Sequence, residues 1–225
     1  MEILSELDMH NCNGVSTPMC SSVPLRVVDG SPPTDTTRYR HTLGKLQYLS
    51  LTRPDISYTV DRLSQFMHTP TIEHWKVVKR VLRYLNETTG LGLHIIRSFD
   101  SNLYMYTDVD LAGDLNDIIY TVGYILLFGP NPVSWSLRKQ RVVARSSTEA
   151  EYKSVTNALV EITWVRNLFH ELHVTILKTP MIHCDNVGVQ AHRVHVTHTH
   201  ACEQLVDTFT KALPKSTFIR CRSNC

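Results

Sequence analysis

The sequence predicts a mixed α/β fold that is preceded by a small helical extension. Apolar residues recur every three or four positions over 36–87, strand-like apolar runs follow over 103–137, and a long amphipathic helix is predicted over 147–172. The 225 residues are 42% apolar and 20% charged, with a net charge of +2, which argues against disorder over most of the chain. No apolar run approaches the ~20 residues that a membrane helix requires, so we expect no membrane partner.

The first 37 residues are predicted to be loosely ordered. They are rich in Ser, Pro and Thr and lack a sustained period, which is typical of a linker. The acidic start of the chain lacks the basic and apolar regions of a signal peptide, and the six cysteines include no CxxC pair. We therefore expect an intracellular protein with free thiols, in the cytoplasm or the nucleus.

Three helices are predicted in the next segment, residues 38–95. The first ends before Pro54, the second covers Ile56–Met67, and the third begins after Thr71, which suits an N-cap. The segment holds nine Lys or Arg residues against four acids. Four of them line one side of the third helix: Lys76, Lys79, Arg80 and Arg83. This side is either a solvated polar face or a surface that binds nucleic-acid phosphates.

The rest of the chain predicts alternating strands and helices. Three strands, the first ending at Asp108, are joined by turn residues and suggest an antiparallel meander. After them we expect the long helix from Ser147, a strand that ends at Asp185, a strand over 193–198 and a closing helix over 205–213. This order indicates a mixed α/β layer.

Four acids stand where such a fold brings side chains together. Asp108 and Asp185 end strands, Glu149 lies in the first turn of the long helix, and Asp207 opens the closing helix. Clustered carboxylates repel one another, and oxygen ligands suit Mg²⁺ or Mn²⁺. Acids at these positions are also common helix caps and turn residues, so position alone leaves both interpretations open.

Four motifs, in this order, resemble the ribonuclease H domain of copia-type retrotransposon Pol polyproteins: YTDVDLAG (106–113), ARSSTEAEY (144–152), CDN (184–186) and QLVDTFTKALP (204–214). The upstream sequences YRHTLGKLQYL (39–49), TRPDI (52–56) and HW (74–75) resemble the end of the reverse transcriptase in the same polyproteins. The resemblance implies a ribonuclease H-like mixed sheet with flanking helices over 96–225. It also implies a helical connection over 38–95 and a remnant of the reverse transcriptase thumb and linker over 1–37.

The resemblance implies an enzyme that cuts the RNA strand of an RNA–DNA hybrid by two-metal catalysis with Mg²⁺ or Mn²⁺. The catalytic and metal-binding acids would be the four named above: Asp108, Glu149, Asp185 and Asp207. Asp110 and Glu151 are second candidates; on a helix Glu151 points about 200° away from Glu149, and we expect Glu149 to be the ligand. Ser147 and Thr148 would bind hybrid phosphates or cap the helix.

The histidine-rich stretch before Asp207 suggests two further roles. His198 or His200 could assist product release or proton transfer, as the resemblance implies, or the stretch could hold zinc, although no closed ligand spacing supports zinc. Solvated loop histidines are the simpler interpretation.

This copy departs from the family pattern. The segment between Asn186 and Val206 is considerably shorter than in the family, and the polymerase and integrase regions are missing. The alternative function is therefore a catalytically dead relic that at most binds nucleic acid non-specifically.

Overall fold

The computed structural model describes residues 2–20, 25–98, 100–110, 119–140, 143–185, 195–199 and 204–222. The chain forms two compact units. Among the described residues, the helical unit contains the chain up to Leu93 together with Ala212–Arg222, and the α/β unit contains His94–Lys211. The described part of the chain contains no helix that is both long and apolar enough to cross a membrane.

The helical unit confirms the three helices that apolar spacing predicts. Its elements are α1 (Glu2–Glu6), α2 (Thr36–Leu49), the 3₁₀ turn η1 (Pro54–Ile56), α3 (Ser57–Ser64), α4 (Ile72–Glu87) and α7 (Lys215–Arg222). Thr71 caps α4 as predicted, because its side chain accepts a hydrogen bond from the backbone N–H of His74. Pro54 begins η1, which matches the preference of proline for the first position of a helix.

The core of the helical unit includes side chains from the start of the chain. Leu43 and Leu46 of α2 and Leu82 of α4 are fully buried, and Ile3 and Leu4 pack into the same cluster. Met19 and Leu25 are also buried there. The segment that we expected to be loosely ordered thus contributes apolar side chains to the core of the helical unit, because burying them against the helices removes them from water.

The α/β unit confirms the predicted mixed fold. Its elements are β1 (Leu103–Asp110), β2 (Thr121–Phe128), β3 (Asn131–Lys139), α5 (Ser147–Glu171), β4 (Met181–Cys184), β5 (His195–His198) and α6 (Asp207–Thr210). The strand order is β3-β2-β1-β4-β5. β1, β2 and β3 form the antiparallel meander, and β4 and β5 add to β1 in parallel. A five-stranded mixed sheet with flanking helices fits a ribonuclease H-like fold.

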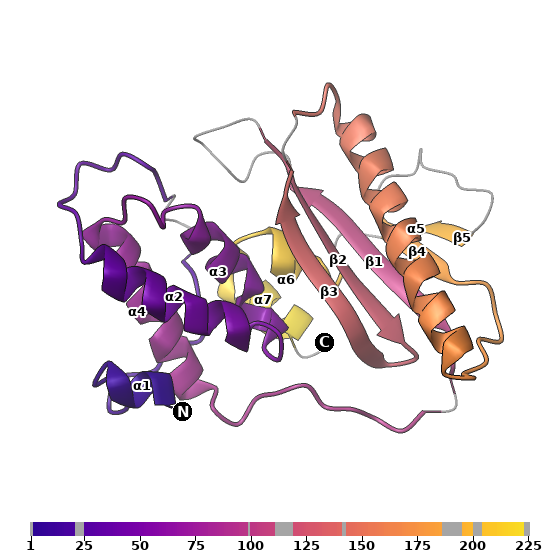
Figure 1. Ribbon diagram of the computed structural model, residues 1–225, viewed down its shortest axis with the longest axis horizontal. Coiled ribbons are helices and arrows are strands. Elements are labelled where there is room, and N and C mark those ends of the chain that lie inside the picture. The colour runs from indigo at the N-terminus through magenta and orange to yellow at the C-terminus, as the bar shows by residue number, and fades with distance from the viewer. Residues whose placement is uncertain are drawn as a thin grey trace. The chain divides into compact units, whose positions relative to one another are not determined.

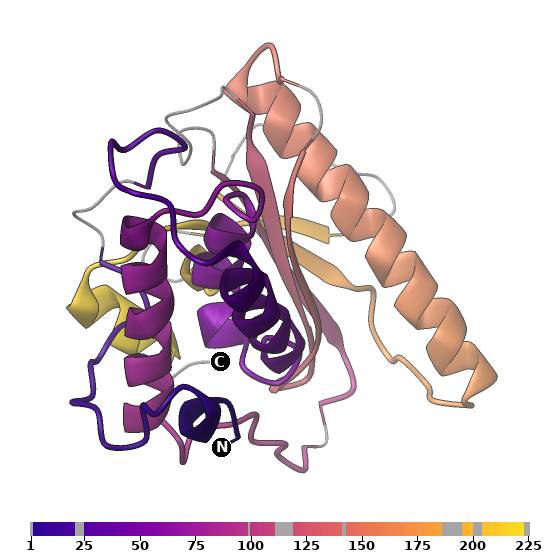
Figure 2. The same ribbon diagram turned by 60° about the vertical axis from the view of Figure 1, so that its left-hand side comes forward.

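Helices cover both faces of the sheet. α5 runs along one face (Figure 2). Val155 and Ile162 of α5 pack there on Leu103 and Met105 of β1. On the opposite face, Val206 precedes α6 and packs on Ile125 of β2 and its neighbours. Side chains alternate between the two faces along each strand, so β1 can supply apolar residues to α5 and polar residues to α6.

Two elements beside the predicted acids end at other residues than expected. β1 continues past Asp108 to Asp110, so that Asp108 lies within a strand that pairs with β2 along its full length. The predicted closing helix is shorter, because α6 ends at Thr210 and Lys211 has an extended backbone (φ −132°, ψ 148°). Pro214 lies before α7, and the residue before a proline is disfavoured in the helical region. A continuous helix is therefore interrupted here.

Gly123 allows α6 to approach the sheet closely. It pairs with Asp108 across β1 and β2, and a Cβ at this position would lie 2.6 Å from Cγ2 of Thr210 and 3.3 Å from Cγ2 of Val206. Gly123→Ala is therefore expected to displace α6 and to lower the free energy of unfolding by about 1–3 kcal/mol. Urea unfolding measures this change.

The matched control is Gly44→Ala in α2, where an added Cβ meets nothing within 4 Å. It should leave stability unchanged or raise it by up to about 1 kcal/mol, because alanine favours a helix over glycine. Equal effects of the two substitutions would contradict the close approach of α6.

Candidate active site

Three carboxylates converge in the α/β unit. Asp108 lies in the central strand β1, Glu151 in the second turn of α5, and Asp185 directly after β4. One oxygen of each lies within 4.8 Å of the others, and this is the only group of at least three potential metal ligands among the residues that the structure describes. Asp108 and Glu151 are 1% and 7% exposed, and Asp185 is partly exposed. The parallel pairing of β1 with β4 places Asp108 and Asp185 at the same end of the sheet.

Each of the three acids has one carboxylate oxygen without a partner among the described residues. Oδ1 of Asp108, Oε2 of Glu151 and Oδ1 of Asp185 are buried and have no hydrogen-bond partner within the described ranges. Burial, together with the negative charges of Asp185 and Asp108, raises the pKa of Glu151 to about 8. Burial and the charge of Asp108 also raise the pKa of Asp185. A divalent cation relieves such repulsion, and an all-oxygen set of ligands suits Mg²⁺ or Mn²⁺. The triad could therefore hold a metal ion.

Asp207 joins this group through a lysine. Lys211 Nζ lies 3.1 Å from Oδ2 of Asp108 and 3.2 Å from Oδ1 of Asp207, and the hydroxyl of Thr210 donates a 2.6 Å hydrogen bond to Oδ2 of Asp108. Burial raises the pKa of Asp207, while Lys211 lowers it and Asp108 raises it further. Sequence reasoning did not identify Lys211 or Thr210. The sequence signal for Lys211 is its spacing, because it lies four residues, about one helical turn, after Asp207.

The structure does not bring Glu149, which we expected to be the helix ligand, into the group. Glu149 accepts hydrogen bonds from Nζ of Lys153 at 2.7 Å and from the backbone N–H of Arg145 at 2.8 Å, and its pKa is lowered first by Lys153. Glu151 faces Asp108 and Asp185 instead. The sequence held the signal for this, because Glu151 lies one turn before Val155 on the apolar stripe that packs on the sheet.

Ser146 is the N-cap residue of α5. Its side chain accepts the backbone N–H of Glu149 at 3.1 Å, as an N-cap does, whereas Ser147 and Thr148 are exposed in the first turn. Exposure leaves Ser147 and Thr148 as candidates for binding phosphates.

The basic side of α4 is partly occupied by the start of the chain. Nη2 of Arg80 donates to the hydroxyl of Thr17 at 2.9 Å, and Nε of Arg83 donates to the carbonyl of Asn13 at 2.7 Å. Lys76 forms an ion pair with Glu73 at 2.6 Å, and Lys79 is exposed. Two of the four basic residues thus fasten residues 13–17 to α4. The proposed phosphate surface on this helix stays a prediction.

Little is described of the two predicted auxiliary histidines. His200 lies outside the described residues, and His198 is described only as the last residue of β5. Their proposed roles, including zinc binding, therefore stay predictions. The neighbouring His183 stacks on Tyr106, and its Nδ1 lies 2.9 Å from the hydroxyl of Thr199.

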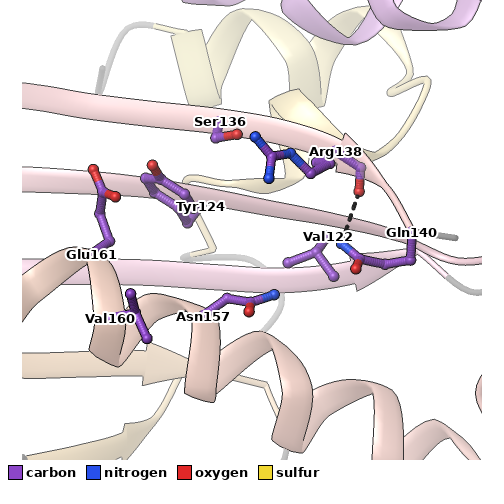
Figure 3. Close-up of a pocket in the computed structure, with 8 residues that line it drawn as sticks. All are labelled: Val122, Tyr124, Ser136, Arg138, Gln140, Asn157, Val160 and Glu161. Atoms are coloured by element: carbon purple, nitrogen blue, oxygen red, sulfur yellow. Dashed lines mark hydrogen bonds between the residues drawn. The ribbon is translucent and has the colours of Figure 1, made fainter. Parts of the chain in front are cut away.

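A separate groove of about 310 Å³ lies between α5 and the strands β2 and β3 (Figure 3). Arg138 and Gln140 lie at one end of it, and Tyr124 and Glu161 lie toward the other. Ser134 donates a 2.8 Å hydrogen bond to Glu161, so this acid is already engaged. The groove contains none of the predicted metal-binding acids.

Comparison with known proteins identifies the family of the chain. The chain is 41% identical to the retrovirus-related Pol polyprotein from transposon RE1 of Arabidopsis thaliana and 40% identical to that from transposon RE2, in each case over 97% of the chain and 17% of the relative. It is 35% identical to the Pol polyprotein from transposon TNT 1-94 of Nicotiana tabacum, over 82% of the chain and 14% of the relative. No family model and no solved structure matches the chain.

The chain belongs to the retrovirus-related Pol polyproteins of copia-type transposons. It spans about a sixth of the length of the RE1 and RE2 polyproteins. The two alignments cover 245 positions against 225 residues, so these relatives hold at least 245 − 225 = 20 positions that the chain lacks. The predicted shortening between Asn186 and Val206 falls mostly on residues outside the described ranges.

Proposed function

We propose that the α/β unit is a ribonuclease H-type domain that hydrolyses the RNA strand of an RNA–DNA hybrid. The observation that carries this proposal is the convergence of Asp108, Glu151 and Asp185 with buried, unpartnered oxygens at one end of a ribonuclease H-like sheet. Membership of the retrotransposon Pol family supports it, because this family resembles the chain over both units. Glu151 replaces Glu149 in the proposed set of ligands, and Asp207 completes the set.

Divalent cations in this site would activate a water molecule and stabilise the leaving oxygen of an in-line displacement. The chain itself supplies the positions of the ligands. Thr210 and Lys211 contact Oδ2 of Asp108, whereas Oδ1 has no partner among the described residues. Oδ1 would therefore be available to a cation that Glu151 and Asp185 also bind. Because burial and the neighbouring acids raise the pKa of Glu151 to about 8, binding of a cation at this carboxylate would be coupled to release of a proton.

The proposed substrate follows from the chemistry of hybrids. Contacts with 2′-hydroxyls in the wide minor groove would distinguish RNA from DNA, and phosphates would bind without sequence preference. Ser147, Thr148 and the exposed Lys79 are the described residues best placed to bind phosphate, because no carboxylate pairs with them within the described ranges.

A labelled RNA–DNA hybrid incubated with Mg²⁺ tests this function. The native chain should cleave the RNA strand and leave a DNA duplex of the same sequence intact. Asp108→Asn should reduce the rate by at least about 10³-fold with an unchanged circular dichroism spectrum, because one oxygen ligand and one charge are lost at the centre of the site.

Equal cleavage by the native chain and Asp108→Asn would reject the proposed site. Binding of the hybrid without any cleavage would instead favour the relic, for which the positions missing relative to RE1 and RE2 are the supporting observation.

A further inference from the structure

Lys211 places a positive charge inside the acid group. Its ammonium lies between Asp108 and Asp207, whose side chains are 1% and 12% exposed, while the lysine side chain is 39% exposed. The backbone N–H of Lys211 donates to the carbonyl of Asp207, and the two residues are one helical turn apart. The lysine therefore reaches the acids from the end of α6, with its stem partly open to solvent.

The two oxygens of Asp108 have different surroundings. Oδ2 accepts from the hydroxyl of Thr210 at 2.6 Å and lies 3.1 Å from Nζ of Lys211, whereas Oδ1 has no partner among the described residues. Glu151 and Asp185 likewise keep one unpartnered oxygen each. The site thus has one half that lacks positive charge and a second half, between Asp108 and Asp207, that already contains it.

We propose that Lys211 is a tethered cation that occupies the position of a second divalent ion between Asp108 and Asp207. The free chain then binds one Mg²⁺ or Mn²⁺ tightly, at Asp108, Glu151 and Asp185. A tethered ammonium has a high effective concentration, so a second ion must displace it at an energetic cost. A substrate phosphate offers Lys211 another partner, so the second ion enters together with the nucleic acid. This proposal rests on the proposed function of the site.

Mn²⁺ titration followed by electron paramagnetic resonance, without nucleic acid, tests the role of Lys211. The native chain should bind one Mn²⁺ tightly and a second one weakly. Lys211→Met should tighten the second binding step by at least about tenfold, because the competing charge is gone. Lys153→Met is the matched control, since Lys153 also pairs with an acid four residues earlier, Glu149, but lies outside the group.

Lys211→Arg keeps the charge and should keep the second Mn²⁺ weak, which separates the effect of the charge from that of an altered side chain. Where Lys211→Met fails to fold, Lys211→Gln, which also lacks the charge, should show the same tightening. Two equally tight Mn²⁺ ions on the native chain, or an unchanged second step in Lys211→Met, would overturn the role of Lys211 and leave the metal site standing. Complete absence of Mn²⁺ binding by the native chain would overturn the metal site itself and the role of Lys211 with it.

Discussion

Glu151→Gln is expected to abolish tight Mn²⁺ binding and to lower RNA-strand cleavage by at least about a hundredfold, whereas Glu149→Gln should change both by less than about threefold. The physical reason is the direction of the two side chains on α5. Glu151 is 7% exposed and lies within 4.8 Å of Asp108 and Asp185, while Glu149 forms an ion pair with Lys153 at the helix surface. The same substitution, glutamate to glutamine, is thus made at two positions that are two residues apart, and only Glu151 faces Asp108 and Asp185.

Two measurements test this prediction: the rate of cleavage of a labelled hybrid, and the affinity of each variant for Mn²⁺. Thermal unfolding of both variants shows whether they fold. Glu151→Gln should be at least as stable as the native chain without metal, because it removes a buried acid that lies beside two others. The reverse order of effects, with Glu149→Gln inactive and Glu151→Gln active, would restore Glu149 as the ligand and contradict the orientation of α5.

The metal-free chain is expected to lose stability as the pH rises from about 5 to about 8.5. Burial and the charges of Asp185 and Asp108 raise the pKa of Glu151 to about 8, from 4.5 in the unfolded chain. Between these values the folded chain binds more protons than the unfolded chain, so the free energy of unfolding falls with rising pH. Each pKa unit corresponds to about 1.4 kcal/mol, so the loss should amount to a few kcal/mol. The raised pKa values of Asp185 and Asp207 act in the same direction.

Urea unfolding in EDTA at both pH values measures this loss. Glu151→Gln should flatten the dependence, because glutamine does not titrate. Mg²⁺ added at the higher pH should restore stability to the native chain, since a ligand that binds only the folded state stabilises it. A native chain that is equally stable or more stable at the higher pH would show that these carboxylates are not held together in the fold.

The order of the elements was predictable because it depends on local periodicity. Apolar spacing located α2, α4 and α5, alternation located β1, and Thr71 was recognised as a cap from its residue type and position. The burial of the start of the chain was not predictable. The few apolar residues there, such as Ile3 and Leu4, have no period of their own and become buried only against helices that lie far away in the sequence.

The sequence alone determined which motifs carry acids and that the chain resembles a retrotransposon Pol polyprotein, because both depend on residue identity and order. Only the tertiary structure decided which acids meet. Two glutamates in one motif lie on opposite sides of α5, and the packing of that helix on the sheet selects Glu151. Tertiary packing also brings Lys211 into contact with Asp108, which lies 103 positions earlier in the sequence. Contacts between residues so far apart produce no local periodicity from which they could be predicted.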